Sequence, residues 1–331
     1  MIASLTVVVI GRNEGARLAH SLQSVRQMRL DGWHVELIYV DSCSADDSVA
    51  VARAHGFTPM LLDTARPTAA KARNLGWRAG SGELVLFLDG DTILQRDFVA
   101  ESVDAFDDPE IAVIWGHRRE LHPEASIYNR VLDLDWMYAP GWTQFCGGDA
   151  LFRRSVLQQA NGFDEALIAG EEPELCRRIL AAGYRILHVD RAMTLHDMAM
   201  TNAGQYWSRA VRAGHAYAEV SARFRKSAQP FWNDEVKRNR SRAGMLMVLA
   251  VLGVMSSVAL RSVWPVVCAY ALLLLLAARS GWRARWKSNN PVTLFLYGLH
   301  SQLQQVPIYC GQRAFARDQR RGRQSPLMEY K

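Results

Sequence analysis

The chain has 331 residues, of which 49% are hydrophobic, and a formal net charge of +6 at pH 7. This length accommodates one large α/β domain with an appendage. Hydrophobic residues concentrate after residue 243, and basic residues crowd the segments 237–242, 279–287 and 313–323. Because these basic segments flank apolar ones, we expect anionic lipid headgroups as their partners and no nucleic acid.

The five cysteines are scattered along the chain without a CxxC pair: Cys43, Cys146, Cys176, Cys268 and Cys310. This spacing argues against a disulfide framework or a zinc cluster, and it fits a reducing compartment. The first apolar run, Leu5 to Ile10, is too short for the core of a secretory signal. We therefore expect the N-terminal part of the chain to face the cytoplasm.

Strand and helix signals alternate over about the first 190 residues. We predict strands over 6–10, 35–40 and 83–88, and helices over 14–28, 45–55, 71–79 and 172–182. The alternation predicts an α/β fold with a mostly parallel, doubly wound sheet, whose ligands bind at the carboxyl ends of the strands.

Polar residues follow three of these strands, at Arg12-Asn13-Glu14, Asp41-Ser42 and Asp89-Gly90-Asp91. Two carboxylates so spaced after a buried strand can share a hard divalent cation, Mg²⁺ or Mn²⁺, which takes phosphate oxygens as further ligands. Taken alone, Asp89 to Asp91 is equally typical of a simple turn. The other two polar strand ends favour a ligand site.

Two uncharged apolar runs, 244–260 and 263–278, lie near the end of the chain and are separated by Arg261-Ser262. Each spans roughly 25 Å as a helix, just short of a ~30 Å hydrocarbon core. Basic clusters outside both runs predict a membrane hairpin with cytoplasmic outer ends. The alternatives are a re-entrant hairpin and a buried hairpin in a soluble protein. Residues 291–311 are typical of an interfacial helix.

Six motifs in order resemble those of family 2 glycosyltransferases, which have the GT-A fold, Rossmann-like with a mostly parallel sheet. They are residues 6–14, 40–46, 72–76, 88–91, 162–165 and 170–172. The resemblance covers about residues 4 to 217. It implies a metal-dependent inverting transfer from a nucleotide-sugar donor, by expectation a UDP-sugar, to a lipid-linked or glycan acceptor in polysaccharide or glycoconjugate biosynthesis.

The resemblance also implies roles for residues on the donor side. Asp41 is expected to contact the nucleotide base, and Arg73 to hold the nucleotide. Asp89 is expected to bind both the nucleotide and the metal, and Asp91 the metal. Glu14, at the first strand end, is a further candidate for the nucleotide pocket.

Three further matches leave alternatives open. His196 occupies a position where family members often place a histidine close to the metal, but a lone histidine is as often an ordinary satisfied side chain. Arg209 can reach the diphosphate, or can belong to a basic helix face against lipid headgroups. Cys146-Gly147-Gly148 resembles the acceptor-side motif of processive synthases such as cellulose synthase.

An inverting transfer needs a carboxylate that deprotonates the acceptor hydroxyl. The family usually supplies the aspartate of a Glu-Asp pair, whereas this chain has Glu172 at that position, after Glu171. Glu172 is therefore the expected base and Glu171 the fallback. The alternative is that both only place negative charge at a helix N-terminus.

These expectations give four segments. They are a catalytic domain over 1–217, a basic connecting helix over 218–243, the transmembrane or re-entrant hairpin over 244–279, and an interfacial helix with a basic tail over 280–331. The expected location is the cytoplasmic membrane, with the catalytic domain facing the cytoplasm.

Three other functions compete with this interpretation. A sugar-phosphate nucleotidyltransferase would open with a glycine-rich phosphate loop, which residues 11–15 do not match. A processive synthase would carry a Gln-x-x-Arg-Trp motif, and Gln205 to Arg209 departs from it. The third is a membrane-tethered scaffold that binds a nucleotide sugar without catalysis, which the replacement at Glu172 favours.

Overall fold

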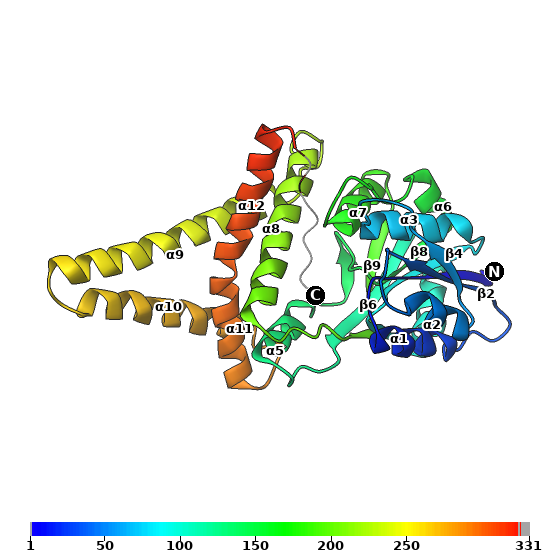
Figure 1. Ribbon diagram of the computed structural model, residues 1–331, viewed down its shortest axis with the longest axis horizontal. Coiled ribbons are helices and arrows are strands. Elements are labelled where there is room, and N and C mark those ends of the chain that lie inside the picture. Colours follow the sequence, from blue (N-terminus) through cyan, green and yellow to red (C-terminus); the bar gives the residue numbers. More distant parts are fainter. Residues whose placement is uncertain (1, 324, 326–331) are drawn as a thin grey trace. The chain divides into compact units, whose positions relative to one another are not determined.

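The computed structural model describes residues 2–323 and residue 325, and its chain divides into two compact units. The first unit comprises Met1–Leu121 and Trp136–Met198, and the second comprises His122–Asp135 and Ala199–Lys331. The predicted domain boundary at residue 217 falls inside helix α8 (Ala203–Phe224), which belongs to the second unit. Figure 1 shows the sheet of the first unit and the helices of the second.

The first unit is built on one sheet, which has nine strands among the described residues, in the order β3-β2-β1-β4-β8-β6-β9-β5 with β7 paired to β9. The strands are β1 (Ser4–Gly11), β2 (His34–Asp41), β3 (Thr58–Leu61), β4 (Leu84–Asp89), β5 (Thr92–Leu94), β6 (Ile111–Glu120), β7 (Gly141–Thr143), β8 (Ala150–Arg153) and β9 (Arg185–His196). Strands β3, β2, β1 and β4 are parallel, as are β6 and β9, whereas β5, β7 and β8 pair antiparallel. The predicted α/β fold with a mostly parallel sheet is confirmed.

Helices cover both faces of this sheet, with α1 and α2 on one side and α3 and α7 on the other (Figure 1). The first unit contains α1 (Ala16–Arg26), α2 (Ser48–Ala54), α3 (Ala69–Ala79), α4 (Phe98–Ser102), the 3-10 helix Val103–Asp107, α6 (Arg154–Gln159) and α7 (Glu171–Ala181). Strands β1 and β4 form its core, because their apolar side chains are buried on both faces. The predicted strands and helices lie within a few residues of the observed ones.

The register of the parallel strands aligns their polar ends. Gly11 of β1 lies opposite Asp41 of β2, and Ile10 lies opposite Asp89 of β4. Because the strands run in the same direction, these ends meet at one edge of the sheet, where open α/β sheets bind ligands.

The second unit is helical. It contains α5 (Ile127–Asp135), α8, α9 (Asn233–Ala259), α10 (Trp264–Arg283), α11 (Pro291–Leu303) and α12 (Gln305–Arg320). Helix α8 packs against α12, and α10 packs against both α9 and α11. The interfacial helix predicted over 291–311 is divided at Gln304 into α11 and α12. Pro307, which lacks a backbone N–H, stands in the first turn of α12, where it costs no helical hydrogen bond.

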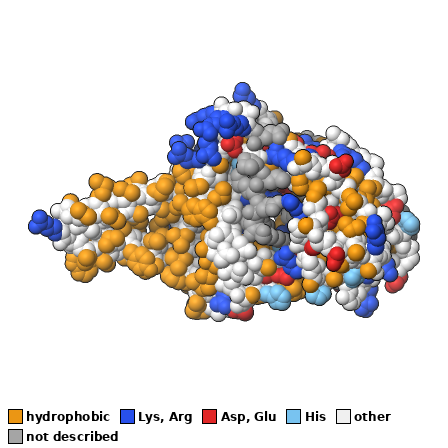
Figure 2. All heavy atoms as spheres, in the orientation of Figure 1, with side chains coloured by type: hydrophobic (Ala, Val, Ile, Leu, Met, Phe, Trp, Pro, Cys, Tyr) orange, Lys and Arg blue, Asp and Glu red, His pale blue; other side chains and the backbone are white. Residues whose placement is uncertain are grey.

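Helices α9 and α10 contain the two predicted apolar runs and are long and apolar enough to cross a membrane. Their side chains are largely exposed, including Leu252 (56% exposed) and Leu275 (67%). Hydrophobic side chains cover the surface of both helices in Figure 2. Of the predicted basic tail, residues 324 and 326–331 lie outside the described residues.

Candidate active site

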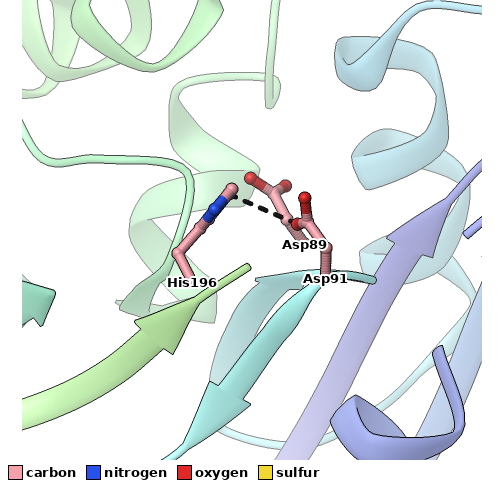
Figure 3. A group of neighbouring side chains, drawn as sticks. All are labelled: Asp89, Asp91 and His196. Atoms are coloured by element: carbon pink, nitrogen blue, oxygen red, sulfur yellow. Dashed lines mark ion pairs between the residues drawn. The ribbon is translucent and has the colours of Figure 1, made fainter. Parts of the chain in front are cut away.

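A group of two carboxylates and one imidazole lies at the carboxyl edge of the sheet. Asp89 ends β4, Asp91 directly precedes β5, and His196 ends β9, where it pairs with Thr92. Their ligand atoms all lie within 4.8 Å of one another. Figure 3 shows the three side chains converging, with His196 Nε2 3.3 Å from Asp91 Oδ1. Two carboxylates and one imidazole are a donor set that fits Mg²⁺ or Mn²⁺.

Arg73 of helix α3 joins this group to the start of helix α7. Its guanidinium is 2% exposed and pairs with Asp89 through Nη2, at 2.9 Å. Its Nη1 lies 2.8 Å from Glu171 Oε1 and 2.9 Å from Glu172 Oε1. Burial opposes the charge, but the carboxylates, led by that of Glu172, raise the pKa of Arg73. Arg73 therefore stays charged and holds the three carboxylates in fixed positions.

Glu172 has the properties of a general base. Helix α7 begins at Glu171, after Gly170 in the left-handed conformation with φ 85°. Burial and then the charge of Glu171 raise the pKa of Glu172 to about 7, against the opposing effect of Arg73. The Glu172 side chain is 16% exposed, compared with 6% for Glu171. Of the two, Glu172 is thus the more accessible to a substrate hydroxyl.

Two glycines let the backbone pass close to these charges. A Cβ on Gly148 would lie 2.8 Å from Arg73 Nη2 and 2.9 Å from Asp89 Oδ2, and one on Gly147 would lie 2.4 Å from Arg118 Nη2. Before them, Cys146 is buried with its Sγ 3.5 Å from that of Cys176, and its interaction with that thiol and burial raise the pKa of Cys146. The predicted acceptor-side motif therefore borders Arg73 and Asp89.

Asp149 and Arg118 are two charged residues of this site that the sequence motifs did not identify. Asp149 accepts hydrogen bonds from the backbone N–H of Asp89 (3.1 Å) and from the hydroxyl of Thr194 (2.8 Å). Arg118, on β6, places Nε 3.3 Å from Asp149 Oδ2. One signal could have found them: like the earlier strands, β6 ends in polar residues, and Asp149 directly follows the glycine pair.

Asp41, which is predicted to contact the base of the nucleotide, is buried at the end of β2. Its Oδ2 accepts a hydrogen bond from the backbone N–H of Ser44 (2.8 Å), and its Oδ1 accepts one from the hydroxyl of Tyr39 (3.1 Å). The other nucleotide-pocket candidate, Glu14, is also buried and lies 3.0 Å from Arg17. Both stand at the edge that carries Asp89, as their strand ends predict.

Arg209 lies in helix α8 of the second unit. Burial raises the pKa of the nearby Asp135, but the pair with His300 and then the charge of Arg209 lower it, and the net shift is downward. Its predicted contact with a diphosphate stays a prediction.

Comparison with known proteins identifies relatives that match somewhat more than half of the chain. A pre-mycofactocin glycosyltransferase of Mycobacterium tuberculosis is 30% identical over 209 residues, which are 58% of this chain and 42% of the relative. The O-antigen chain rhamnosyltransferase RfbN of Salmonella typhimurium is 25% identical over 211 residues, 58% of this chain and 66% of the relative. The matches cover less than two thirds of either relative's own length.

Among solved structures, the mannosyltransferase PcManGT of Pyrobaculum calidifontis, in complex with GDP-Man and Mn²⁺, has a similar fold. It superposes with a TM-score of 0.63 and 20% sequence identity, over 95% of this chain and 87% of that protein. The GT-A fold expected from the motifs is confirmed.

Family models give the final assignment. The model of glycosyl transferase family 2 matches residues 6–159, and that of glycosyl transferase family group 2 matches residues 84–301. The second match extends well past the sheet into the helices of the second unit. Together with the fold and the charged site at its strand ends, these matches show that the chain belongs to the family 2 glycosyltransferases.

Proposed function

We propose that the protein transfers a sugar with inversion from a nucleoside diphosphate donor, in a reaction that needs Mg²⁺ or Mn²⁺, to a lipid-linked or glycan acceptor. The observation that carries this proposal is the link through Arg73 between the carboxylate–imidazole group and Glu172. A UDP-sugar is the first donor to test, and a GDP-sugar the second, because PcManGT binds GDP-Man and Mn²⁺.

The donor side requires stabilisation of the charge that develops on the departing diphosphate. Asp89, Asp91 and His196 would hold a divalent cation, which would supply that stabilisation when bound. The carboxylate of Asp41 and the side chain of Glu14, at the neighbouring strand ends, are the proposed contacts of the nucleotide. Arg73, whose guanidinium is already paired with three carboxylates, is proposed to act mainly by fixing their positions.

The acceptor side requires removal of a proton from the attacking hydroxyl. Glu172 Oε would accept it, since a pKa of about 7 leaves much of this carboxyl ionised at neutral pH while keeping it basic. The replacement of the family's aspartate is accommodated because Glu172 reaches Arg73 at 2.9 Å. The ion pair between Glu172 and Arg73 supports catalysis over a non-catalytic scaffold.

The acceptor is proposed to be presented at a membrane. Helices α9 and α10 expose apolar side chains over the runs 244–260 and 263–278, and basic residues lie beyond the outer ends of both runs. The RfbN relative is an O-antigen chain rhamnosyltransferase. A lipid-linked sugar at the cytoplasmic face is the acceptor that these features favour.

The test is release of nucleoside diphosphate from a panel of UDP- and GDP-sugars by detergent-purified protein. Reactions would contain Mg²⁺, Mn²⁺ or EDTA, with and without a membrane lipid extract. We expect metal-dependent release from one donor, increased by the lipid extract. We also expect Asp91→Ala to abolish this release and Glu172→Gln to reduce it by about 100-fold or more.

Glu171→Gln is the matched variant for the base, because both carboxylates contact the same guanidinium nitrogen. If Glu171→Gln loses turnover while Glu172→Gln keeps it, the base is Glu171. Donor binding by the wild type without release, under every condition tested, would favour the scaffold.

A further inference from the structure

The mechanism proposed above gives no role to two neighbouring side chains at the site, those of Arg118 and Trp136. Arg118 lies on β6, two residues before the end of the strand, and Trp136 directly follows helix α5. The Arg118 guanidinium lies over the Trp136 ring, 5.4 Å from its centroid. The centroid of the same ring lies 5.0 Å from that of the His196 imidazole, at an interplanar angle of 57°. The pair therefore borders the proposed cation site.

Arg118 is only partly satisfied by its neighbours. Its Nε pairs with Asp149 Oδ2, but its Nη2 is buried and has no hydrogen-bond partner within the part of the chain that the structure describes. A buried donor without an acceptor costs free energy, and such a group in a binding site is commonly completed by a ligand. Nη2 lies beside Gly147, in the loop that also contacts Asp89 and Glu172 through Gly148.

The position of the pair identifies what it would contact. In an inverting transfer the sugar lies between the leaving phosphate, here near Asp89, and the base, here Glu172. Arg118 interacts electrostatically with both of these residues. An indole face with a neighbouring hydrogen-bond donor is the combination that a pyranose ring fits, because the ring has an apolar C–H face and an edge of hydroxyls.

We propose that Trp136 and Arg118 bind the transferred sugar of the donor, with the ring resting on the indole and a hydroxyl oxygen accepting a hydrogen bond from Arg118 Nη2. This inference rests on the proposed function and assigns the residues that select the sugar.

The charges around this pair also define the class of sugar. The carboxyls of Asp89, Asp91, Asp149, Glu171 and Glu172 outnumber the guanidinium groups of Arg73 and Arg118 by three, and a divalent cation held by Asp89 and Asp91 would still leave one negative charge in excess. Arg118 is already paired with Asp149, so it carries little uncompensated charge for a second anion. A sugar that brings its own carboxylate would meet repulsion. The site should therefore take neutral pyranoses and reject uronic acids.

The test compares affinities, which do not depend on turnover. Titration calorimetry with full-length protein and Mn²⁺ would give dissociation constants for UDP-glucose, UDP and UDP-glucuronate, or for GDP-mannose and GDP if the donor panel selects guanosine. We expect Trp136→Leu and Arg118→Lys each to weaken the neutral donor about 10-fold and the nucleoside diphosphate less than twofold. The uronate donor should bind the wild type more weakly than the neutral one.

Two variants make this result specific. Trp136→Phe keeps an aromatic face and should restore most of the affinity for the donor. Trp142→Leu removes the indole from the exposed pair that Trp142 forms with Arg185, 4.2 Å from its ring, and should change nothing.

Equal weakening of donor and nucleoside diphosphate would overturn the assignment, because it would place the pair against the nucleotide or the cation. Unchanged donor affinity with reduced transfer to the acceptor would overturn it in favour of an acceptor contact. Failure of the proposed function is distinguishable from both, since the wild type would then bind donor and nucleoside diphosphate without releasing product in any condition.

Discussion

Glu172 is the residue whose environment gives the proposed reaction its pH dependence. Burial and the neighbouring charge of Glu171 raise its pKa to about 7. A base works in its deprotonated form, so activity is low below this pKa and full above it. We expect kcat/KM to fall about tenfold per pH unit below pH 7, and to level off above it.

The fall in kcat/KM at low pH should disappear in Glu172→Gln, because its residual rate does not depend on this carboxyl. It should persist in the control Glu110→Gln, which changes an exposed carboxylate in a surface turn. A limb centred near pH 4.5 in the wild type would show that the base is an ordinary exposed carboxylate.

Asp149 links the end of β4 to Arg118, so we predict that it acts by positioning. Asp149→Asn keeps the shape of the side chain but leaves the Arg118 charge without its partner in a largely buried place. Removing one partner of such a pair costs about 3 kcal/mol. The melting temperature should fall by roughly 10 °C. Thermal unfolding would measure it, with the exposed Asp31→Asn as the control, and equal melting temperatures would contradict the role.

The sequence predicts only part of this site, because only some of its residues directly follow strands that can be recognised from the sequence. Asp41, Asp89 and Asp91 follow strands whose apolar runs are unmistakable, so their common edge follows from parallel pairing alone. Arg118 lies on β6 and Asp149 directly precedes β8, where the pairing becomes antiparallel and the order of the strands in the sheet departs from their order along the chain. Their meeting depends on tertiary arrangement, which no local pattern records.

At the scale of elements, the second unit depends on close helix crossings through glycine. A Cβ on Gly311 of α12 would lie 2.0 Å from the carbonyl oxygen of Val211, and one on Gly214 of α8 would lie 1.9 Å from that of Ile308. Backbones that approach this closely leave no room for a methyl group. The pairing of α8 with α12 therefore requires glycine at both positions.

Gly311→Ala and Gly244→Ala should consequently change stability in opposite directions. Alanine at 311 would force α8 and α12 apart and cost about 1–3 kcal/mol. Alanine at 244 of α9, where a Cβ meets open space, gains about 1 kcal/mol of helix propensity. Thermal unfolding followed by circular dichroism in detergent would compare them. An unchanged or raised melting temperature in Gly311→Ala would rule out the close crossing.

Within the first unit, the elements up to about residue 90 could be predicted more fully than the later ones, since strands β5 to β9 were not predicted. Strands β1 and β4 consist of continuous apolar runs, which predict buried strands. Strand β3 was missed because it has only four residues and contains Pro59. In the second unit, the break between α11 and α12 at Gln304 interrupts a sequence whose apolar residues continue across it.

At the scale of the whole molecule, the charged site and the apolar hairpin belong to different units. The proposed donor and base residues, Arg209 excepted, lie in the first unit, and helices α9 and α10 lie in the second. Donor chemistry and membrane binding should therefore be separable by mutation, whereas transfer to a lipid-linked acceptor should need both.

The double variant Leu252→Arg with Leu275→Arg would test this separation. Both side chains are more than half exposed, Leu252 at the middle of the apolar run 244–260 and Leu275 near the middle of α10. An arginine there costs about 2.5–3.5 kcal/mol of insertion each. We expect the variant to stop floating with anionic lipid vesicles and to lose transfer to the lipid extract, while donor hydrolysis stays within twofold of wild type.

Leu61→Arg is the matched control, because Leu61 is 65% exposed on β3 of the first unit and its replacement should leave flotation unchanged. If the double variant floats like the wild type, the hairpin does not enter the bilayer and its apolar surface serves another contact. If it loses donor hydrolysis together with flotation, the two units are coupled, and donor binding needs the membrane-bound arrangement of α9 and α10. Retained hydrolysis without flotation would leave the hairpin one task, which is to bring the site to an acceptor that lies in the membrane.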